Sequence, residues 1–226
     1  MTPPADRAQL SKTAVVERGL KLADADGLDA LTIRKLAADL GVTPMALYWH
    51  FRSKEELLTG LSERVWSEMD VTVDPAAPWP AQLRGLLESL IGVLRAHSSA
   101  PHLLSRYKGS NESQLRAMEV SLQVLRDGAG FGPEEASEIV RLALWTAIML
   151  ILSENGFEPG ESPAERDEAY RQRVLRLSML SPAAYPRVIE HAKELCASPE
   201  LHFRLGVDMF MAGVETLARA NQTRPL

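Results

Sequence analysis

Five side chains in one short stretch of the chain offer groups that contact nucleic acid. They are Arg34, Tyr48, Trp49, His50 and Lys54. Cationic groups bind phosphates, guanidinium and imidazole groups also reach base edges, and exposed aromatic rings contact thymine methyl groups and sugars. This is chemistry of recognition and not of bond breaking. The stretch therefore predicts a surface that binds double-stranded DNA.

The residues around these side chains predict two short helices joined by a tight turn. Ile33, Leu36 and Leu40 recur at helical spacing, and Thr32 is a suitable N-cap. Gly41 should end this first helix, since a residue without Cβ enters the left-handed conformation at little cost. The spacing predicts a helix-turn-helix motif at residues 32–51.

The second helix is expected from Thr43, a second N-cap, to Phe51, with Pro44 at its first position. At about 100° per residue, Leu47 and Phe51 share the inward face. The outward face then holds Met45, Tyr48, Trp49 and Arg52, with His50 at the flank. A helix this short cannot bury all of its aromatic rings, so an exposed cluster with an external partner is expected.

A third helix is predicted from Ser53 to Met69. Ser53 and Glu56 have the spacing of a capping box, in which each side chain accepts from the other's backbone amide. Lys54 then lies at a helix N-terminus, where a cation is favourable only if a phosphate is near. We interpret Lys54 as a contact to the DNA backbone.

The flanking sequence predicts three regions. Residues 1–10 are polar and contain prolines, which is typical of a flexible arm. Residues 11–70 form the DNA-binding domain, which a first helix at 11–26 completes. Three prolines in 71–80 mark the boundary to a helical ligand-binding and dimerisation domain at 71–226. Because strand-like alternation is absent, we predict an all-α fold, with the later helices at 81–97, 101–107, 112–127, 133–155, 165–180, 182–196 and 199–220.

Two of the later helices indicate a dimer. Residues 139–152 are apolar nearly all round, and the helix at 199–220 has a broad apolar face. Two such helices per subunit suit a four-helix interface about a two-fold axis. The alternative is that both are central core helices.

Large, deformable apolar side chains also suggest a ligand cavity in this second region. Helical spacing alone does not separate a cavity from plain core. The side chains predicted to line a cavity are Leu86, His102, Leu103, Tyr107, Met118, Leu122, Trp145 and Met149.

The sequence favours a binding protein over an enzyme. Its five histidines form no His-Glu-Xaa-Xaa-His run, and no CxxC, GxSxG or phosphate-binding GxxxxGK[ST] pattern occurs. We therefore predict no catalytic residue, metal or cofactor other than a small-molecule effector, although His97 and His102 could border a cavity or a metal-bearing ligand.

Composition limits how the protein can bind DNA and where in the cell it is expected. The net charge is −5, so DNA binding must depend on local cations, not on the total. The lone Cys196 excludes an intrachain disulfide, the N-terminus has no apolar signal region, and the longest apolar run, 142–152, is short of the ~20 residues of a membrane span. A cytoplasmic protein without a membrane partner is expected.

The DNA-binding stretch resembles a known family. The run LTIRKLAADLGVTPMALYWHFRSKEEL is similar to the DNA-binding segment of the TetR family of bacterial regulators, and the likeness is close over residues 11–69. The resemblance implies base or groove contacts from Arg34, Pro44, Met45, Tyr48, Trp49 and His50, and phosphate contacts from Thr32, Thr43 and Lys54. One departure is that Pro44-Met45-Ala46 offers no Gln, Arg or Asn, so Arg34 and DNA shape carry more of the specificity.

These observations predict a homodimeric repressor that binds a palindromic operator and is released by a small apolar effector. The alternative is a helical small-molecule-binding or protein-interaction module without DNA binding. A helical enzyme is a third hypothesis. Salt-dependent DNA binding separates the first two, and turnover of a bound ligand would reveal the third.

Overall fold

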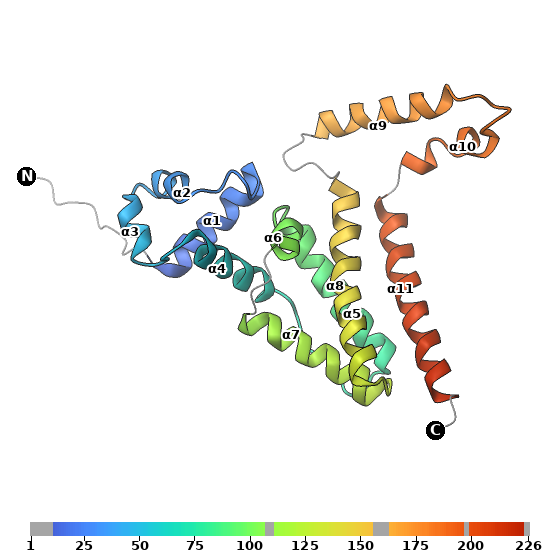
Figure 1. Cartoon of the computed structure of the whole chain (residues 1–226), viewed down its shortest axis with the longest axis horizontal. Coiled ribbons are helices and arrows are strands. Elements are labelled where there is room, and N and C mark those ends of the chain that lie inside the picture. The colour runs from blue at the N-terminus through green and yellow to red at the C-terminus, as the bar shows by residue number, and fades with distance from the viewer. Residues whose placement is uncertain (1–10, 107–110, 156–162, 197–198, 224–226) are drawn as a thin grey trace, which may run out of the picture.

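The computed structural model describes residues 11–106, 111–155, 163–196 and 199–223, and over these ranges the chain is helical without a strand. The predicted all-α fold is confirmed. Figure 1 shows helices α1–α4 grouped at one end, α5–α8 and α11 at the other, and α9 and α10 projecting from the second group. We call these parts the head, the body and the arm. The flexible arm predicted at the N-terminus, residues 1–10, is a different segment and lies outside the described residues.

The head consists of α1 (Lys12–Asp26), α2 (Ile33–Asp39), α3 (Pro44–Tyr48) and α4 (Lys54–Trp66). Ser11 caps α1 by accepting from the Ala14 amide at 3.1 Å. Gly41 has φ +67°, the left-handed conformation expected of a helix-ending glycine. The apolar faces of the four helices meet in one core, whose fully buried members include Leu31, Leu36, Leu47, Phe51, Leu57 and Leu61.

Two helices of the head are shorter than predicted. α3 ends at Tyr48 and not at Phe51, because the amide of His50 bonds to the Leu47 carbonyl three residues back, at 2.9 Å, which is the pattern of a 3₁₀ turn and not of an α-helix. α4 ends at Trp66 and not at Met69. The amide of Asp70 donates to Ser89 Oγ on α5 at 2.8 Å, which draws the chain out of the helix direction.

The body consists of α5 (Trp79–Ala96), α6 (Ala100–Arg106), α7 (Glu112–Gln123), α8 (Pro133–Asn155) and α11 (Pro199–Gln222). α8 packs against α5, α6, α7 and α11. At Gly206 a Cβ atom would lie 2.4 Å from Leu150 Cδ2, so any larger residue there would require the Leu150 side chain on α8 to move. The helix predicted at 112–127 ends early, and a π-helical turn follows at Val124–Gly128.

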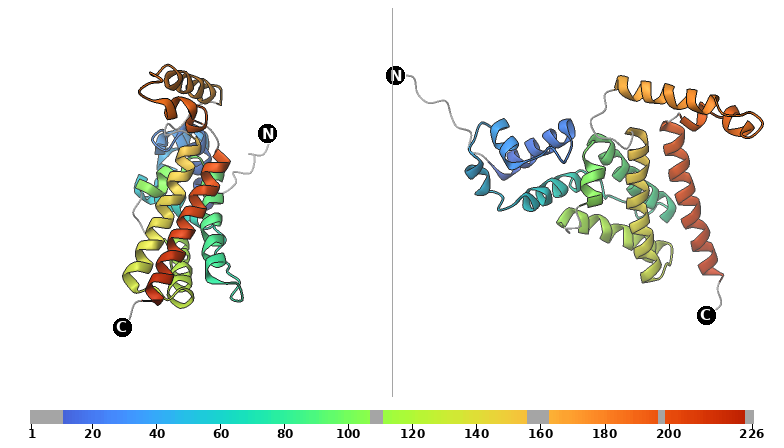
Figure 2. Two further views of the ribbon diagram at one scale, coloured as in Figure 1. Left: turned by 90° about the vertical axis from the view of Figure 1, so that its right-hand side faces the viewer. Right: turned by 45° about the horizontal axis from the view of Figure 1, so that its top comes forward.

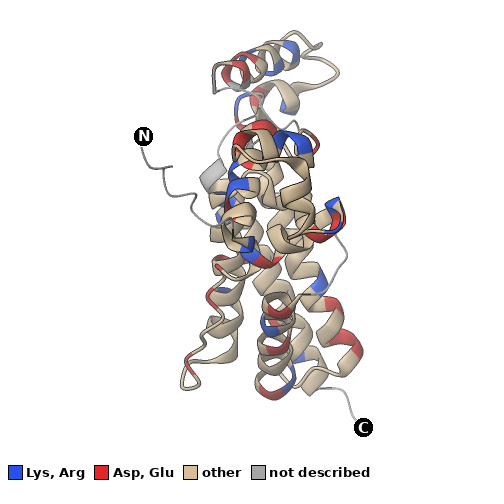
Figure 3. Cartoon of the chain, turned by 90° about the vertical axis from the view of Figure 1, so that its left-hand side faces the viewer, with Lys and Arg blue, Asp and Glu red and all other residues tan. Residues whose placement is uncertain are grey.

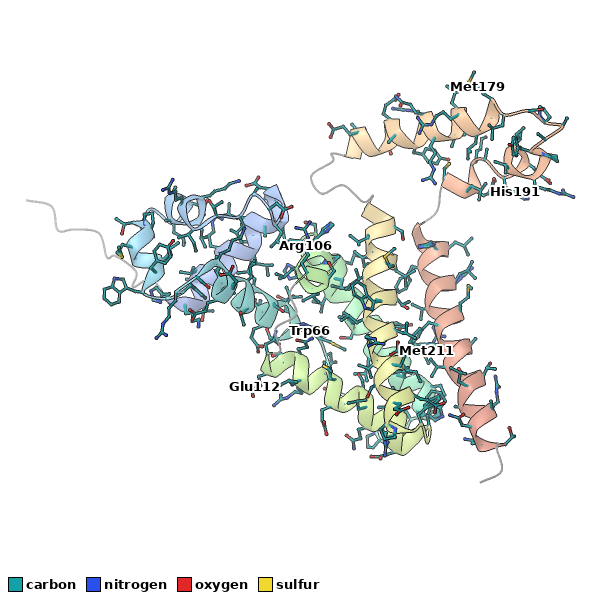
Figure 4. All side chains as sticks on the ribbon, in the orientation of Figure 1. Trp66, Arg106, Glu112, Met179, His191 and Met211 are labelled. Carbon is teal, nitrogen blue, oxygen red and sulfur yellow. The ribbon has the colours of Figure 1, made fainter. Side chains whose placement is uncertain are left out.

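The arm contains α9 (Pro163–Ser178), α10 (Pro186–Glu190) and a 3₁₀ turn at Glu194–Cys196. The predicted single helix at 182–196 is wrong. Tyr185 precedes a proline and has φ −133° and ψ 52°, outside the helical region, so no helix runs through it. Ala192 is the one buried residue among the described side chains of the arm. In Figure 4 the labelled Met179 and His191 lie on this arm, away from the body.

α8 has the bounds predicted for it, but its apolar stretch is longer than the run at 142–152. By length and composition alone, Pro133–Ser153 would be sufficient to cross a membrane, and 33% of this window is buried in the chain. The buried side includes Ala147, Ile148 and Ile151, which belong to the core. The exposed side carries Leu142 and Trp145, so much of the apolar surface of α8 is not covered by its own chain.

Candidate nucleic-acid interface and ligand cavity

The orientation of α3 is fixed by what lies beneath it and by its cap. Leu47 and the following Phe51 are fully buried, while Thr43 Oγ1 accepts from the Ala46 amide at 3.3 Å. The opposite side is open: Met45 is 65% exposed and Trp49 is 85% exposed. Tyr48, 47% exposed, lies on the same side. The predicted division of this helix into inward and outward faces is confirmed.

Two cations beside α3 form no salt bridge with a carboxylate among the described residues. Arg34, on α2, is exposed, and Lys54, the first residue of α4, is half-buried. Lys35, by contrast, pairs with Asp26 at 2.9 Å. In Figure 3, which faces the head, Lys and Arg positions along the ribbon are interspersed with Asp and Glu positions. Unpaired cations in such a surface are the ones free to bind phosphate.

The start of α4 differs in one bond from the predicted capping box. Ser53 Oγ accepts from the Glu56 amide at 3.2 Å as expected. Glu56 Oε2, however, accepts from the Arg52 amide at 2.8 Å and not from that of Ser53. This bond, aided by the charge of Lys12, holds the pKa of Glu56 below its usual value. The N-terminus of α4 is thus held firmly, with Lys54 beside its free amides.

The predicted DNA contacts come from adjoining elements of the head, since α2 and α3 pack against each other and α4 follows α3. All are exposed or half-buried and come from α2, α3, their caps and the start of α4: Thr32, Arg34, Thr43, Pro44, Met45, Tyr48, Trp49, His50 and Lys54. Thr32 and Thr43 also cap their helices, Thr32 by accepting from the Lys35 amide at 3.1 Å. Contact of each residue with DNA stays a prediction.

Two groups of hydrogen bonds join the head to the body. In the first group, Asp24 of α1 accepts from His97 Nδ1 at 2.9 Å and from Ser99 Oγ at 2.6 Å. His97 Nε2 also lies 3.0 Å from Glu68 Oε2. In the second group, Asn111 Nδ2 donates to Ser62 Oγ of α4 at 3.1 Å. His97 therefore lies in the junction and not, as one hypothesis had it, at a cavity.

The two carboxylates determine the protonation of His97. Burial of the imidazole acts to lower its pKa, but the hydrogen bonds and charges of Asp24 and Glu68 outweigh this effect. The pKa of His97 is therefore raised above its ordinary value. A charged imidazole donates to both carboxylates at once and so bridges α1, the end of α4 and the end of α5.

A cavity of about 330 Å³ lies where the end of α4 meets α5, α7 and α8. Figure 4 shows Trp66 at this meeting point, near the start of α7 marked by Glu112. The lining is mostly apolar and includes Trp66, Met69, Leu86, Leu90, Met118 and Leu144. Its polar side chains are Gln114, Ser121, Ser137 and Arg141.

The predicted cavity residues fall into separate places. Leu86, Met118 and Leu122 line the cavity. Leu103 is buried in the core and His102 is half-buried on α6, and neither lines the cavity. Trp145 and Met149 are exposed on the outer side of α8, because the inner side of that helix is used for packing. Tyr107 lies outside the described residues.

Sequence reasoning missed Trp66, Met69 and Gln114 as cavity residues. Trp66 and Met69 fall within the helix predicted from Ser53 to Met69, and nothing in that pattern indicates a cavity. Gln114 carried no signal, since a glutamine near a helix start is usually exposed. Only the packing of α7 against α4 brings it to the cavity.

Comparison with known proteins places both halves of the chain. Residues 15–61 match the model of the bacterial regulatory proteins of the tetR family, and residues 73–218 match that of the tetracyclin repressor-like C-terminal domain. The class A tetracycline repressor protein from transposon 1721 of Escherichia coli is 30% identical over 209 residues, covering 91% of each chain.

Solved structures share the same fold. ActR of Streptomyces coelicolor in complex with actinorhodin has a TM-score of 0.79 at 25% identity, covering 93% of this chain and 99% of ActR. BioQ, a protein of Mycobacterium smegmatis, in complex with its double-stranded DNA operator has a TM-score of 0.61 at 22% identity, covering 92% and 99%. Because both parts of the chain match in order and nearly in full, the chain belongs to the TetR family of bacterial regulatory proteins.

Proposed function

We propose that this protein is a transcriptional repressor that binds a palindromic operator as a homodimer and leaves it when a largely apolar molecule fills the body cavity. It acts by binding and not by turnover, in the cytoplasm, with no metal or cofactor beyond the effector. The head corresponds to residues 11–70 and the ligand-binding and dimerisation domain to 71–226. α3 and the turn after it enter the major groove, Arg34 supplies base contacts, and Thr32, Thr43 and Lys54 contact phosphates.

The observation that carries this proposal is that one helix connects both sites. Lys54 begins α4 beside α3, and Trp66 ends it at the cavity wall. A helix of this length spans ~20 Å and transmits displacement as a rigid rod. A molecule that displaces Trp66 therefore tilts the head relative to the body and changes the spacing of the two heads of a dimer.

The dimer is supported by the exposed apolar surface of the body. Leu142, Trp145 and Met149 form a stripe along α8, and the neighbouring α11 exposes Leu205 and Met209. The left view of Figure 2 shows α8 and α11 side by side at the front. Exposed apolar side chains on two long helices that pack against each other suit a four-helix interface with a second copy.

The names of known relatives support the repressor, operator and effector parts of the proposal. The relative from transposon 1721 is named a repressor, BioQ has the same fold and was solved on its operator, and ActR was solved with actinorhodin. Operator release then follows from linkage, because an effector that favours one head spacing must bind more weakly when DNA favours the other. The coupling is expected to be about 1–3 kcal/mol.

Selection of bound duplexes from a random library tests the proposal. We expect a palindrome whose half-sites lie about one helical turn or a multiple apart, bound with an affinity that falls steeply with salt. A folded dimer that enriches no sequence would refute the DNA-binding role. Equal affinity of a bound molecule with and without the operator would refute the coupling.

A further inference from the structure

The cavity contains one polar atom that the rest of the protein leaves unpaired. Gln114 Oε1 is buried and accepts no hydrogen bond, and it is the one such side-chain atom found in the described ranges. Gln114 also lines the cavity. A buried acceptor without a donor is costly, so its presence beside an apolar cavity calls for a partner from outside the chain.

The other polar groups of the cavity are already engaged. Ser121 Oγ donates to the Ala117 carbonyl at 2.8 Å and Ser137 Oγ donates to the Pro133 carbonyl at 2.8 Å. Arg141 pairs with Glu138, and its side chain is 66% exposed, which places its charge toward solvent. Gln114 Oε1 is therefore the polar atom of the cavity lining that is buried and has unused hydrogen-bonding capacity.

We propose that Gln114 is the polar anchor of the effector site and that it selects a largely apolar molecule with a hydroxyl group, such as a fused-ring phenol. This inference rests on the proposed function, because it names the chemistry of the effector that the same cavity takes. A hydroxyl both donates and accepts, so it pairs with either end of a carboxamide. The walls around it supply apolar contact for the rings.

The position of Gln114 places the anchor beside the contacts between α7 and α4. It lies in the first turn of α7, whose cap, Asn111, donates to Ser62 on α4. Glu63 on α4 accepts from Ser113 Oγ at 2.6 Å. A hydroxyl bound at Gln114 therefore lies next to the contacts that join α7 to α4.

The test compares two probes of nearly equal size, 2-naphthol and 2-methylnaphthalene, by calorimetry on the full chain without DNA. The measured quantity is the ratio of the two affinities, because the hydroxyl also binds water in solution. In Gln114→Leu we expect the preference for 2-naphthol to fall by roughly 3- to 10-fold relative to the unmodified protein, the size of one hydrogen bond.

The matched control is Gln123→Leu, the same substitution at an exposed position of the same helix that does not line the cavity. The ratio should stay unchanged there. Gln114→Met, with an unbranched side chain like that of glutamine, repeats the test if leucine does not pack. Both Gln114 variants should keep or raise the Tm of the unliganded protein, since they remove an unpaired polar atom.

Three outcomes are decisive. A ratio that falls only in the Gln114 variants supports the anchor. An equal ratio in all variants overturns the anchor and leaves the cavity as the effector site. Binding of neither probe to the unmodified protein overturns both the anchor and the cavity as a site for such molecules, while operator selection would still test DNA binding separately.

Discussion

α3 and α8 both expose large apolar side chains, but their surroundings differ. α3 and the turn after it present Met45, Tyr48 and Trp49, flanked by the unpaired cations Arg34 and Lys54. α8 presents a long apolar stripe, and it packs against α11, which exposes Leu205 and Met209. Apolar exposure alone indicates only that a partner exists. The kind of partner depends on the neighbouring groups. Cations beside the apolar residues favour a polyanion, and further apolar residues favour a second copy of the chain.

The largest effect is expected from Leu142→Glu, which breaks the apolar character of the α8 face. A two-fold interface receives this charge twice, and burying an unpaired carboxylate costs several kcal/mol. We expect the dimer dissociation constant to rise on the order of 1000-fold, with loss of operator binding. Sedimentation velocity at micromolar concentration measures this change.

Leu115→Glu is its control. Leu115 is 53% exposed and Leu142 48%, but Leu115 lies on α7, away from the α8–α11 face. Its substitution should leave the protein dimeric. Dissociation in both variants, or in neither, would mean that the α8 stripe is not the interface.

On the head, Trp49→Ala should weaken operator binding by about 1–3 kcal/mol, because an exposed ring loses its contacts in the groove. The Tm should stay within a few degrees, since the side chain is 85% exposed. Leu47→Ala, on the opposite face of α3, should instead cost about 2–5 kcal/mol of stability. A large fall in Tm for Trp49→Ala would contradict the assignment of its ring to a binding surface.

Substitution of Lys54 and of Arg34 separates phosphate contacts of the head from base contacts. Lys54→Ala should weaken binding about equally on all sequences and lower the slope of log affinity against log salt by about one. Arg34→Ala should lower the preference for the operator over random duplex, because its guanidinium is expected to contact a base. Binding curves at several salt concentrations separate the two. Equal behaviour of the two variants would mean that both cations contact only phosphates.

The smallest effect concerns the junction between head and body. Because the pKa of His97 is raised in the folded protein, its stabilising contribution is complete below the unfolded value of about 6.5 and is lost as pH rises through the folded value. The Tm should therefore fall by no more than a few degrees as pH rises from about 6 to about 8.

His97→Gln tests this, because the variant keeps hydrogen-bonding capacity but cannot titrate. Its Tm should be less sensitive to pH over the same range than that of the unmodified protein. His102→Gln, at a half-buried histidine with no carboxylate partner among the described residues, is the control. The same pH dependence in all three proteins would exclude His97 as its source.

Local sequence signals predicted much of the head. Thr32, Thr43 and Ser53 cap the helices expected of them, and Gly41 adopts the left-handed turn. These features depend on bonds between residues three or four positions apart, which is why a single sequence contains them. Helix ends were less predictable, because the turn after α3 and the bond from Asp70 to Ser89 involve other elements.

By itself, the sequence determined the all-α class, the helix-turn-helix and the outward position of Tyr48 and Trp49, because periodicity and capping are local. Only the tertiary structure decided which apolar side chains of the body face a cavity, the core or the outside. Leu122, Leu103 and Trp145 are equally apolar at helical spacing, yet they occupy those three places. The physical reason is that burial depends on which helices pack together, and the contact of α7 with α4 that brings Gln114 to the cavity joins residues far apart in the chain.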